Sequence, residues 1–164
     1  MRAILSLLII LAPMAQSAMA EENYADPKAL VQAIYDGYKP GAAKGDPTVH
    51  YSERLKGIAQ LAADTGTGAN PALSSELEPV ADPNFNPFLP DDNALLFDLV
   101  ISEPMRLDDR AVVTVTYHNF DQPRLLSVSL VEESGTWKVD DVASLGSEVP
   151  WLLSWALAAD PYAM

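Results

Sequence analysis

The pattern of hydrophobic and polar residues changes its period part-way along the chain, and this change predicts the fold class. Before residue 65 the apolar side chains recur every three or four residues, which is typical of amphipathic helices. From residue 95 onward they alternate with polar residues, which is typical of strands with one buried face. Helices followed by a run of antiparallel strands indicate an α+β fold, with N-terminal helices packed on a curved antiparallel sheet.

Two N-terminal helices are expected to begin at the same signal, an aspartate followed by a proline. Asp26-Pro27 and Asp46-Pro47 each supply an N-cap side chain and a proline at the first helical position. We therefore expect a first helix over 27–36 and a second over 47–63. The stretch 64–93 is rich in glycine and proline, so no long element is expected there.

Four runs of alternating residues predict four strands, and the turn-forming segments 107–109 and 133–135 are expected to connect some of them. The residues expected to face the core are Phe97, Leu99 and Ile101, then Val113, Val115 and Tyr117, then Leu126, Val128 and Leu130, and finally Trp137 and Val139. A last, very apolar helix is expected over about 147–159. It is interpreted either as a lid over the fold or as a docking surface for a partner.

The N-terminus has the pattern of a secretory signal peptide. Arg2 precedes an apolar run over 4–11, and small residues at Ala18 and Ala20 fit the site that a signal peptidase reads. The run is too short to cross about 30 Å of hydrocarbon, so a membrane anchor is not expected. We expect cleavage after Ala20, a single domain over 21–164, and a periplasmic or secreted protein without a stable membrane anchor.

The charge balance narrows the classes of partner. The chain has 10 basic and 23 acidic residues and a net charge of −13, and loss of Arg2 with the leader would make it more negative. Such a surface repels phosphate backbones and anionic lipids, so nucleic acid is not an expected partner. The charge is interpreted as a solvated surface or as a face that attracts a basic partner. The chain has no cysteine, which excludes thiol catalysis and thiolate metal sites.

Several short motifs resemble a known family. They are Tyr51-Ser52-Glu53-Arg54-Leu55, Asn84-Phe85-Asn86-Pro87-Phe88, and the segment Trp137-Lys138-Val139-Asp140-Asp141-Val142. Together they look like an exported bacterial family of unknown function within the nuclear transport factor 2-like, cystatin-like superfamily. The resemblance covers about residues 26–143. Family members tend to carry a Gln-Asp pair where this chain has Asp91-Asp92, so only Asp92 matches that pair.

The candidate chemistry of the chain is sparse. His50 and His118 are its two histidines, and they form no zinc-binding motif, so neither a metal nor a cofactor is expected. The four acidic doublets are Asp91-Asp92, Asp108-Asp109, Glu132-Glu133 and Asp140-Asp141. Neighbouring residues of a strand point to opposite faces, so a doublet in a strand is not expected to hold one ion with both carboxylates. We interpret the doublets as turn-forming or solvated residues.

The resemblance implies a cone-shaped pocket between the curved sheet and its helices. In related enzymes a buried Asp or His in that cone moves a proton, and the candidates here are Asp98, Asp92 and His118. The aromatic residues Tyr51, Tyr117 and Trp137 are candidates for binding a ligand in the cone. Trp151 and Trp155, in the apolar C-terminal segment, are candidates for binding a partner.

Two functions follow as hypotheses. The first is a non-catalytic binding or interaction module of the bacterial periplasm, which binds a small apolar ligand, a periplasmic protein or a second copy of the chain. The second is a small enzyme of the isomerase, dehydratase or hydrolase type that uses a buried Asp or His. A cone filled with side chains favours the first, and a hollow cone with an ionisable residue at its floor favours the second.

Overall fold

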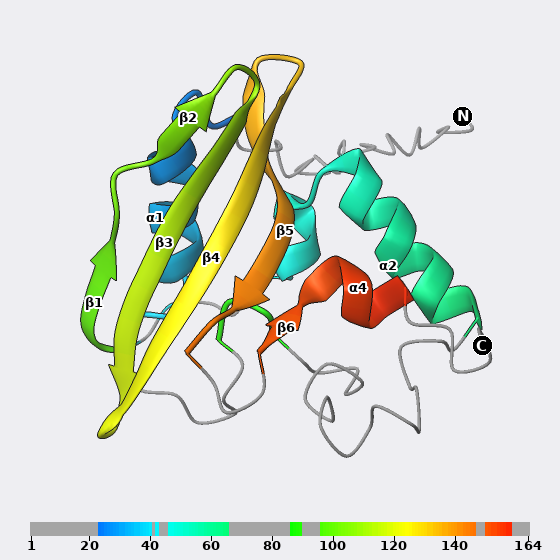
Figure 1. Cartoon of the computed structure of the whole chain (residues 1–164). Coiled ribbons are helices and arrows are strands. Elements are labelled where there is room, and N and C mark those ends of the chain that lie inside the picture. The colour runs from blue at the N-terminus through cyan, green and yellow to red at the C-terminus, as the bar shows by residue number, and fades with distance from the viewer. Residues whose placement is uncertain are drawn as a thin grey trace, which may run out of the picture.

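The computed structural model describes residues 23–40, 42, 46–65, 86–89, 96–146 and 150–158, and within them the chain is an α+β protein (Figure 1). The helices are α1 (Pro27–Asp36), the 3-10 helix η1 (Pro47–His50), α2 (Glu53–Thr65) and α4 (Leu153–Ala158). The strands are β1 (Phe97–Ile101), β2 (Met105–Leu107), β3 (Arg110–Asn119), β4 (Gln122–Glu133), β5 (Thr136–Ser144) and β6 (Trp151–Leu152). No helix of the described residues is long and apolar enough to cross a membrane.

The strands form one antiparallel sheet with the order β1-β3-β4-β5-β6, and β2 also pairs with β3. Two-residue turns join β2 to β3, β3 to β4 and β4 to β5, which explains why these strands lie side by side. The turn after Glu133 has positive φ at both Ser134 and Gly135, as the expected turn over 133–135 requires. The sheet therefore ends at β1 and β2 on one edge and at β6 on the other.

One face of the sheet, the inner face, packs against α1 (Figure 1). Along β3 and β4 the burial alternates with period two, as the sequence predicts. The predicted inward residues of these strands are confirmed as fully buried: Val113, Val115, Tyr117, Leu126, Val128 and Leu130. The other face, which we call the outer face, has no described helix over β3 and β4 (Figure 1).

The first helix has the predicted bounds because its capping signals act locally. The Asp26 carboxylate accepts a hydrogen bond from the Ala29 amide at 3.0 Å, and Pro27 opens the helix. Leu30, Ile34 and their neighbours bury one side of the helix against the sheet. The expected helix and the observed α1 coincide at Pro27–Asp36.

The second helix begins later than expected, because the chain first pairs with β5. Only η1 occupies the start of the predicted range 47–63, and Tyr51 is extended. Tyr51 forms a parallel bridge with Val139, and the Ser52 amide donates to the Val139 carbonyl at 2.7 Å. The Ser52 hydroxyl then accepts from the Leu55 amide at 3.1 Å and so caps α2.

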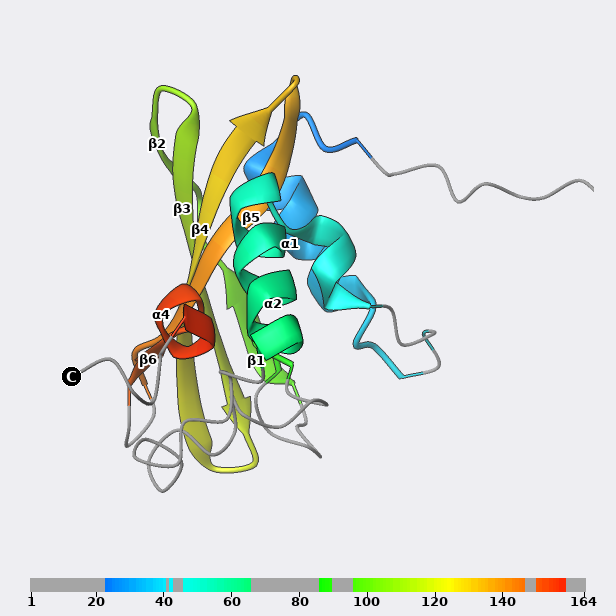
Figure 2. The same cartoon turned by 90° about the vertical axis from the view of Figure 1, so that its right-hand side faces the viewer.

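The C-terminal segment also differs from the expected helix over about 147–159. Trp151 and Leu152 form strand β6 on the edge of β5, because pairing satisfies backbone groups that this edge would otherwise expose. Only Leu153–Ala158 are helical, and this helix, α4, packs beside α2 (Figure 2). Residues 147–149 and 159 lie outside the described residues. The segment is therefore part strand and part helix.

Candidate functional site

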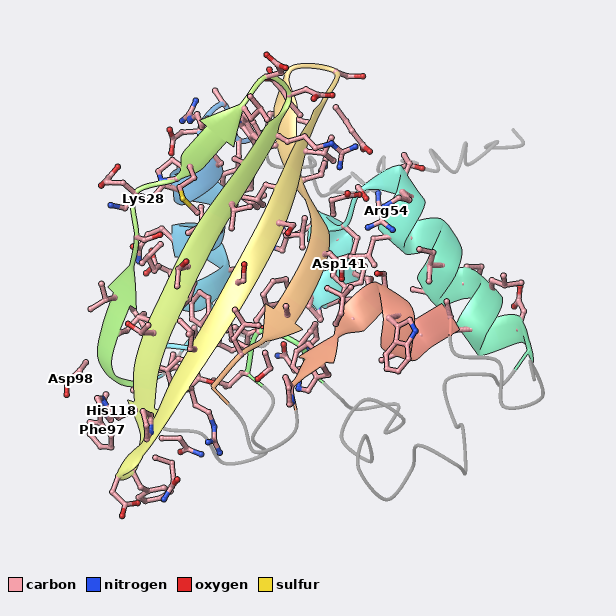
Figure 3. The ribbon with its side chains drawn as sticks, viewed as in Figure 1. Lys28, Arg54, Phe97, Asp98, His118 and Asp141 are labelled. Carbon is pink, nitrogen blue, oxygen red and sulfur yellow. The ribbon has the colours of Figure 1, made fainter. Side chains whose placement is uncertain are left out.

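Two residues expected to carry chemistry, Asp98 and His118, lie next to each other at one end of the sheet (Figure 3). The Asp98 Oδ2 atom is 3.7 Å from the His118 Nδ1 atom, which is longer than a hydrogen bond. Their side chains are 85% and 48% exposed, respectively. The third candidate, Asp92, lies outside the described residues.

A β-bulge in β1 brings these two residues together. Phe97 pairs with His118 and Val100 pairs with Thr116, so two residues of β1 oppose Tyr117 of β3. Asp98 is in the left-handed region with φ of 53°, a conformation in which aspartate is enriched among the non-glycine residues. The bulge also shifts the register by one residue. Phe97 therefore points outward and is exposed, so the prediction that it faces the core is wrong.

An open pocket of about 220 Å³ lies beside the pair. Its lining includes Asp98, His118, Thr116, Arg124 and Gly146. The pocket wall needs a glycine at 146, since a Cβ atom there would lie 2.8 Å from the Leu125 amide nitrogen. An imidazole and a carboxylate thus stand at the rim of a pocket that is open to water. This is not the desolvated acid that the superfamily resemblance implies.

The residues expected to bind a ligand, Tyr51, Tyr117 and Trp137, are all buried in the apolar core. Burial raises the pKa of the Tyr51 hydroxyl well above its ordinary value. The Tyr35 hydroxyl donates to the Phe88 carbonyl at 2.9 Å in the same interior. Aromatic and aliphatic side chains therefore fill the space between the inner face and α1 around these residues.

Asp140 and Asp141 carry the buried carboxylates of the described residues, and both contact Arg54 of α2. Figure 3 labels Arg54 and Asp141 of this group. Asp140 Oδ1 accepts from Arg54 Nε at 2.9 Å and from the Ser52 hydroxyl at 2.8 Å, and Asp140 Oδ2 accepts from Arg110 Nη1 at 2.9 Å. Burial by itself would raise the pKa of Asp140, but hydrogen bonds from Arg54 and Ser52 overcome it and lower the pKa.

This network corrects the interpretation of Asp140-Asp141 as turn-forming or solvated residues, because both lie within β5 and are buried. The register of β5 against β4 shifts at Asp140, so Asp140 is the extra residue of a second bulge. Arg54 Nη2 then lies 3.6 Å from Asp141 Oδ2 while its Nε binds Asp140. Asp141 also accepts hydrogen bonds from the Ser154 amide and hydroxyl, so the doublet joins α2, β5 and α4.

The two tryptophans expected to bind a partner have different environments. Trp151 of β6 is buried in the core, whereas Trp155 of α4 is more than half exposed. Leu153 and Ala156 are the residues of α4 that are buried. The helix therefore has one buried side, and Trp155 is the candidate of this pair that a partner can reach.

A row of exposed apolar side chains, which the sequence pattern does not predict, lies along the edge formed by β1 and β2. We call this row the apolar edge, and it consists of Phe97, Val100, Met105 and Leu107, which are 51–76% exposed. Each pairs with a residue of β3 whose side chain is outside the core: His118, Thr116, Val112 and Arg110. All four apolar side chains therefore lie on the outer face. The exposed side chains of Met105 and Leu107 extend the row beyond β1.

No group of three or more His, Asp or Glu side chains that could hold a metal ion occurs among the described residues. Comparisons with protein-family models, with curated proteins and with solved structures found no match to this chain.

Proposed function

We propose that this protein is an exported, non-catalytic interaction domain that binds a protein partner through the apolar edge. The observation that carries the proposal is the row of four large apolar side chains, each more than half exposed, on one edge of the sheet. Contiguous exposed apolar side chains are uncommon on monomeric proteins and are typical of interaction sites.

The filled interior supports a protein partner rather than a small ligand in a cone. Val113, Val115 and Val128 on the inner face are fully buried against other side chains. A ligand in that position would have to displace close-packed groups, and overfilling a core is itself destabilising. The order of the elements, helices first and then a long antiparallel sheet, supports our proposal that the fold is of the nuclear transport factor 2-like type.

Export and a periplasmic location rest on the N-terminal pattern of Arg2, the apolar run over 4–11 and the small residues before Glu21. We propose that the protein meets its partner after cleavage of this leader. A strong net negative charge keeps such a protein soluble and disfavours non-specific contact with anionic surfaces.

Site-specific photo-crosslinking in the producing bacterium tests the interaction domain. A photoreactive amino acid replaces Val100 in the apolar edge, and a matched probe replaces Gln60, which is exposed on α2. We expect a discrete protein adduct from position 100 and none of the same mass from position 60. The absence of an adduct at position 100, or the same adducts from both positions, would contradict the proposal.

A second candidate function, a small enzyme of the isomerase, dehydratase or hydrolase type, is favoured by the convergence of Asp98 and His118 at an open pocket. In that case His118→Ala would abolish turnover of a substrate while the melting temperature stays unchanged. Asp98→Asn would reduce turnover because it removes the carboxylate that faces the imidazole. Screening the purified protein against panels for these three reaction types provides the measurement.

A further inference from the structure

We propose that the β1–β2 edge binds an extended, basic segment of the partner protein, which adds to the sheet as a further antiparallel or parallel strand. This inference rests on the proposed interaction function and specifies the chemistry of the partner. Three observations carry it: a free strand edge, the apolar edge beside it, and the acidic residues that flank both.

The edge is open for pairing. Within the described part of the chain, β1 and β2 pair only with β3, and no strand lies on their other side (Figure 1). The Ser102 amide donates to the Thr114 carbonyl at 2.9 Å, and the Ser102 hydroxyl accepts from the Thr114 amide at 2.9 Å, so the amide of Ser102 points toward β3. Because these directions alternate along a strand, the amide and carbonyl of Ile101 point away from the sheet. Strand addition uses such groups for its main-chain hydrogen bonds.

The apolar edge supplies side-chain contacts for an added strand. Alternate side chains of that strand would lie on the outer face, next to Val100 and its neighbours. Short length, bulges and charges are common devices that protect an edge strand from aggregation, and β1 has all three. Protection of the edge does not explain why Phe97, Met105 and Leu107 are apolar and exposed. A partner strand with apolar side chains on one face does explain it, because those side chains would cover all three.

The charge of the edge selects a basic partner. Four carboxylates flank the apolar edge, namely Asp98, Glu103, Asp108 and Asp109, and all four residues are exposed. Lys28 pairs with Glu103, and Arg106 pairs with Asp26 while its guanidinium lies over the Trp137 ring. Arg110, opposite Leu107 on β3, pairs with Asp140, so the carboxylates still outnumber the cations along the edge. Lysines or arginines on a partner strand would complement the remaining charge.

The same charge argues against a second copy of this chain as the occupant. Pairing of two identical edges would bring the same carboxylates of each copy toward those of the other. The full sequence has a net charge of −13, and loss of Arg2 makes each copy more negative, so the long-range interaction between copies is repulsive. A basic segment of another protein meets neither obstacle.

Fluorescence anisotropy with defined peptides tests this proposal on the purified protein. The probe is a fluorescein-labelled peptide of about ten residues with alternating valine and lysine, which matches a strand with one apolar face. We expect it to bind at least about tenfold more tightly than a valine and glutamate peptide of the same length. An N-methylated version that cannot form the main-chain ladder should also bind at least about tenfold more weakly.

Protein variants locate the site. Met105→Lys together with Leu107→Lys should weaken binding of the valine and lysine peptide by at least about tenfold, because both side chains are exposed contacts. Leu61→Lys is the control for an added lysine away from the edge, since Leu61 is similarly exposed but lies on α2 near the opposite edge. Hydrogen exchange measured by NMR should show slower exchange of the Ile101 amide when the peptide is bound.

The results separate the inference from the function on which it rests. Equal binding of the glutamate peptide, equal binding of the N-methylated peptide, or equal losses in the Leu61→Lys control would each overturn strand addition. Dimerisation of the protein through Val100 would also overturn it, in favour of a second copy. A protein adduct from position 100 in cells without peptide binding would leave the interaction domain standing and reject this mode of binding.

Discussion

Replacing Asp140 by asparagine tests whether the bulge in β5 is a structural device. The asparagine has nearly the same shape and keeps an oxygen that can accept the hydrogen bond from Ser52. It removes the negative charge that Arg54 and Arg110 bind at 2.9 Å each. It also brings a side-chain amide donor toward guanidinium groups that need acceptors.

The expected cost follows from these contacts and from their exposure. A hydrogen bond to a charged group contributes about 1.5–3 kcal/mol to stability. In Asp140→Asn, the bonds from Arg54 and Arg110 no longer go to a charged carboxylate. Both arginines are about half exposed or more, so solvent screens the pairs and reduces their contribution. We expect Asp140→Asn to lower the free energy of unfolding by about 2–3 kcal/mol at neutral pH.

Urea unfolding followed by tryptophan fluorescence measures this change. Asp109→Asn is the matched control, because Asp109 is exposed in the turn after β2, and its effect should stay within about 0.5 kcal/mol. A loss below about 1 kcal/mol for Asp140→Asn would refute the reasoning, because it would mean that the two arginines are as stable in water as on Asp140.

The stability difference between the wild-type protein and Asp140→Asn should depend on pH in a definite direction. The pKa of Asp140 is lower in the folded protein than its ordinary value of about 3.9, so its charge stabilises the fold above that pH. That stabilisation is lost as the pH falls from about 4 through the lower folded pKa. The difference in stability between the wild-type protein and Asp140→Asn should therefore be constant near neutrality and shrink below about pH 4.

Three further predictions address the core, the pocket wall and export. Trp137→Ala should lower the free energy of unfolding by about 3–5 kcal/mol in urea titrations, because the side chain is buried in the hydrophobic core. Gly146→Ala should lower the free energy of unfolding by about 1–3 kcal/mol, since the new Cβ would lie 2.8 Å from a backbone nitrogen. Gly57→Ala should instead raise the melting temperature, because Gly57 is in a helix and no atom lies within 4 Å of the new Cβ. If the chain is exported as we propose, intact-mass measurement of protein recovered from the periplasmic fraction should give an N-terminus at Glu21, and recovery of the full-length chain in the membrane fraction would contradict this.

The elements that depend on local signals could be predicted from the sequence. Asp26-Pro27 was enough to fix the start of α1, and the period of two was enough to assign the buried residues of β3 and β4. The start of α2 could not be predicted, because it depends on pairing with β5, which lies far away in the sequence. The strand β6 could not be predicted because its apolar residues fit a helix as well as a strand, and only its pairing with β5 decides between them. Ser52 as the cap of α2 is evident only once its contact with Val139 is known.

The candidate site was predicted in its residues but not in its geometry. Asp98 and His118 are candidates by residue type, whereas their proximity depends on the bulge that places two residues of β1 opposite Tyr117. A period-two interpretation assumes that no residue is inserted, so it assigned Phe97 to the wrong face. One inserted residue therefore created both the pair at the pocket and part of the apolar edge.

The two bulges have opposite consequences because their surroundings differ. The bulge at Asp140 lies in a strand that α2 and α4 cover, so its carboxylate is buried and must be bound by arginines. The bulge at Asp98 lies in the edge strand β1, which has β3 as its only neighbour in the sheet among the described residues. Its carboxylate is therefore open to water beside exposed apolar groups. A buried charge that is bound on all sides contributes to stability, whereas an exposed one contributes little to stability and remains available to a partner. We therefore expect substitutions at Asp140 to change the unfolding of the protein and substitutions at Asp98 to change what it binds.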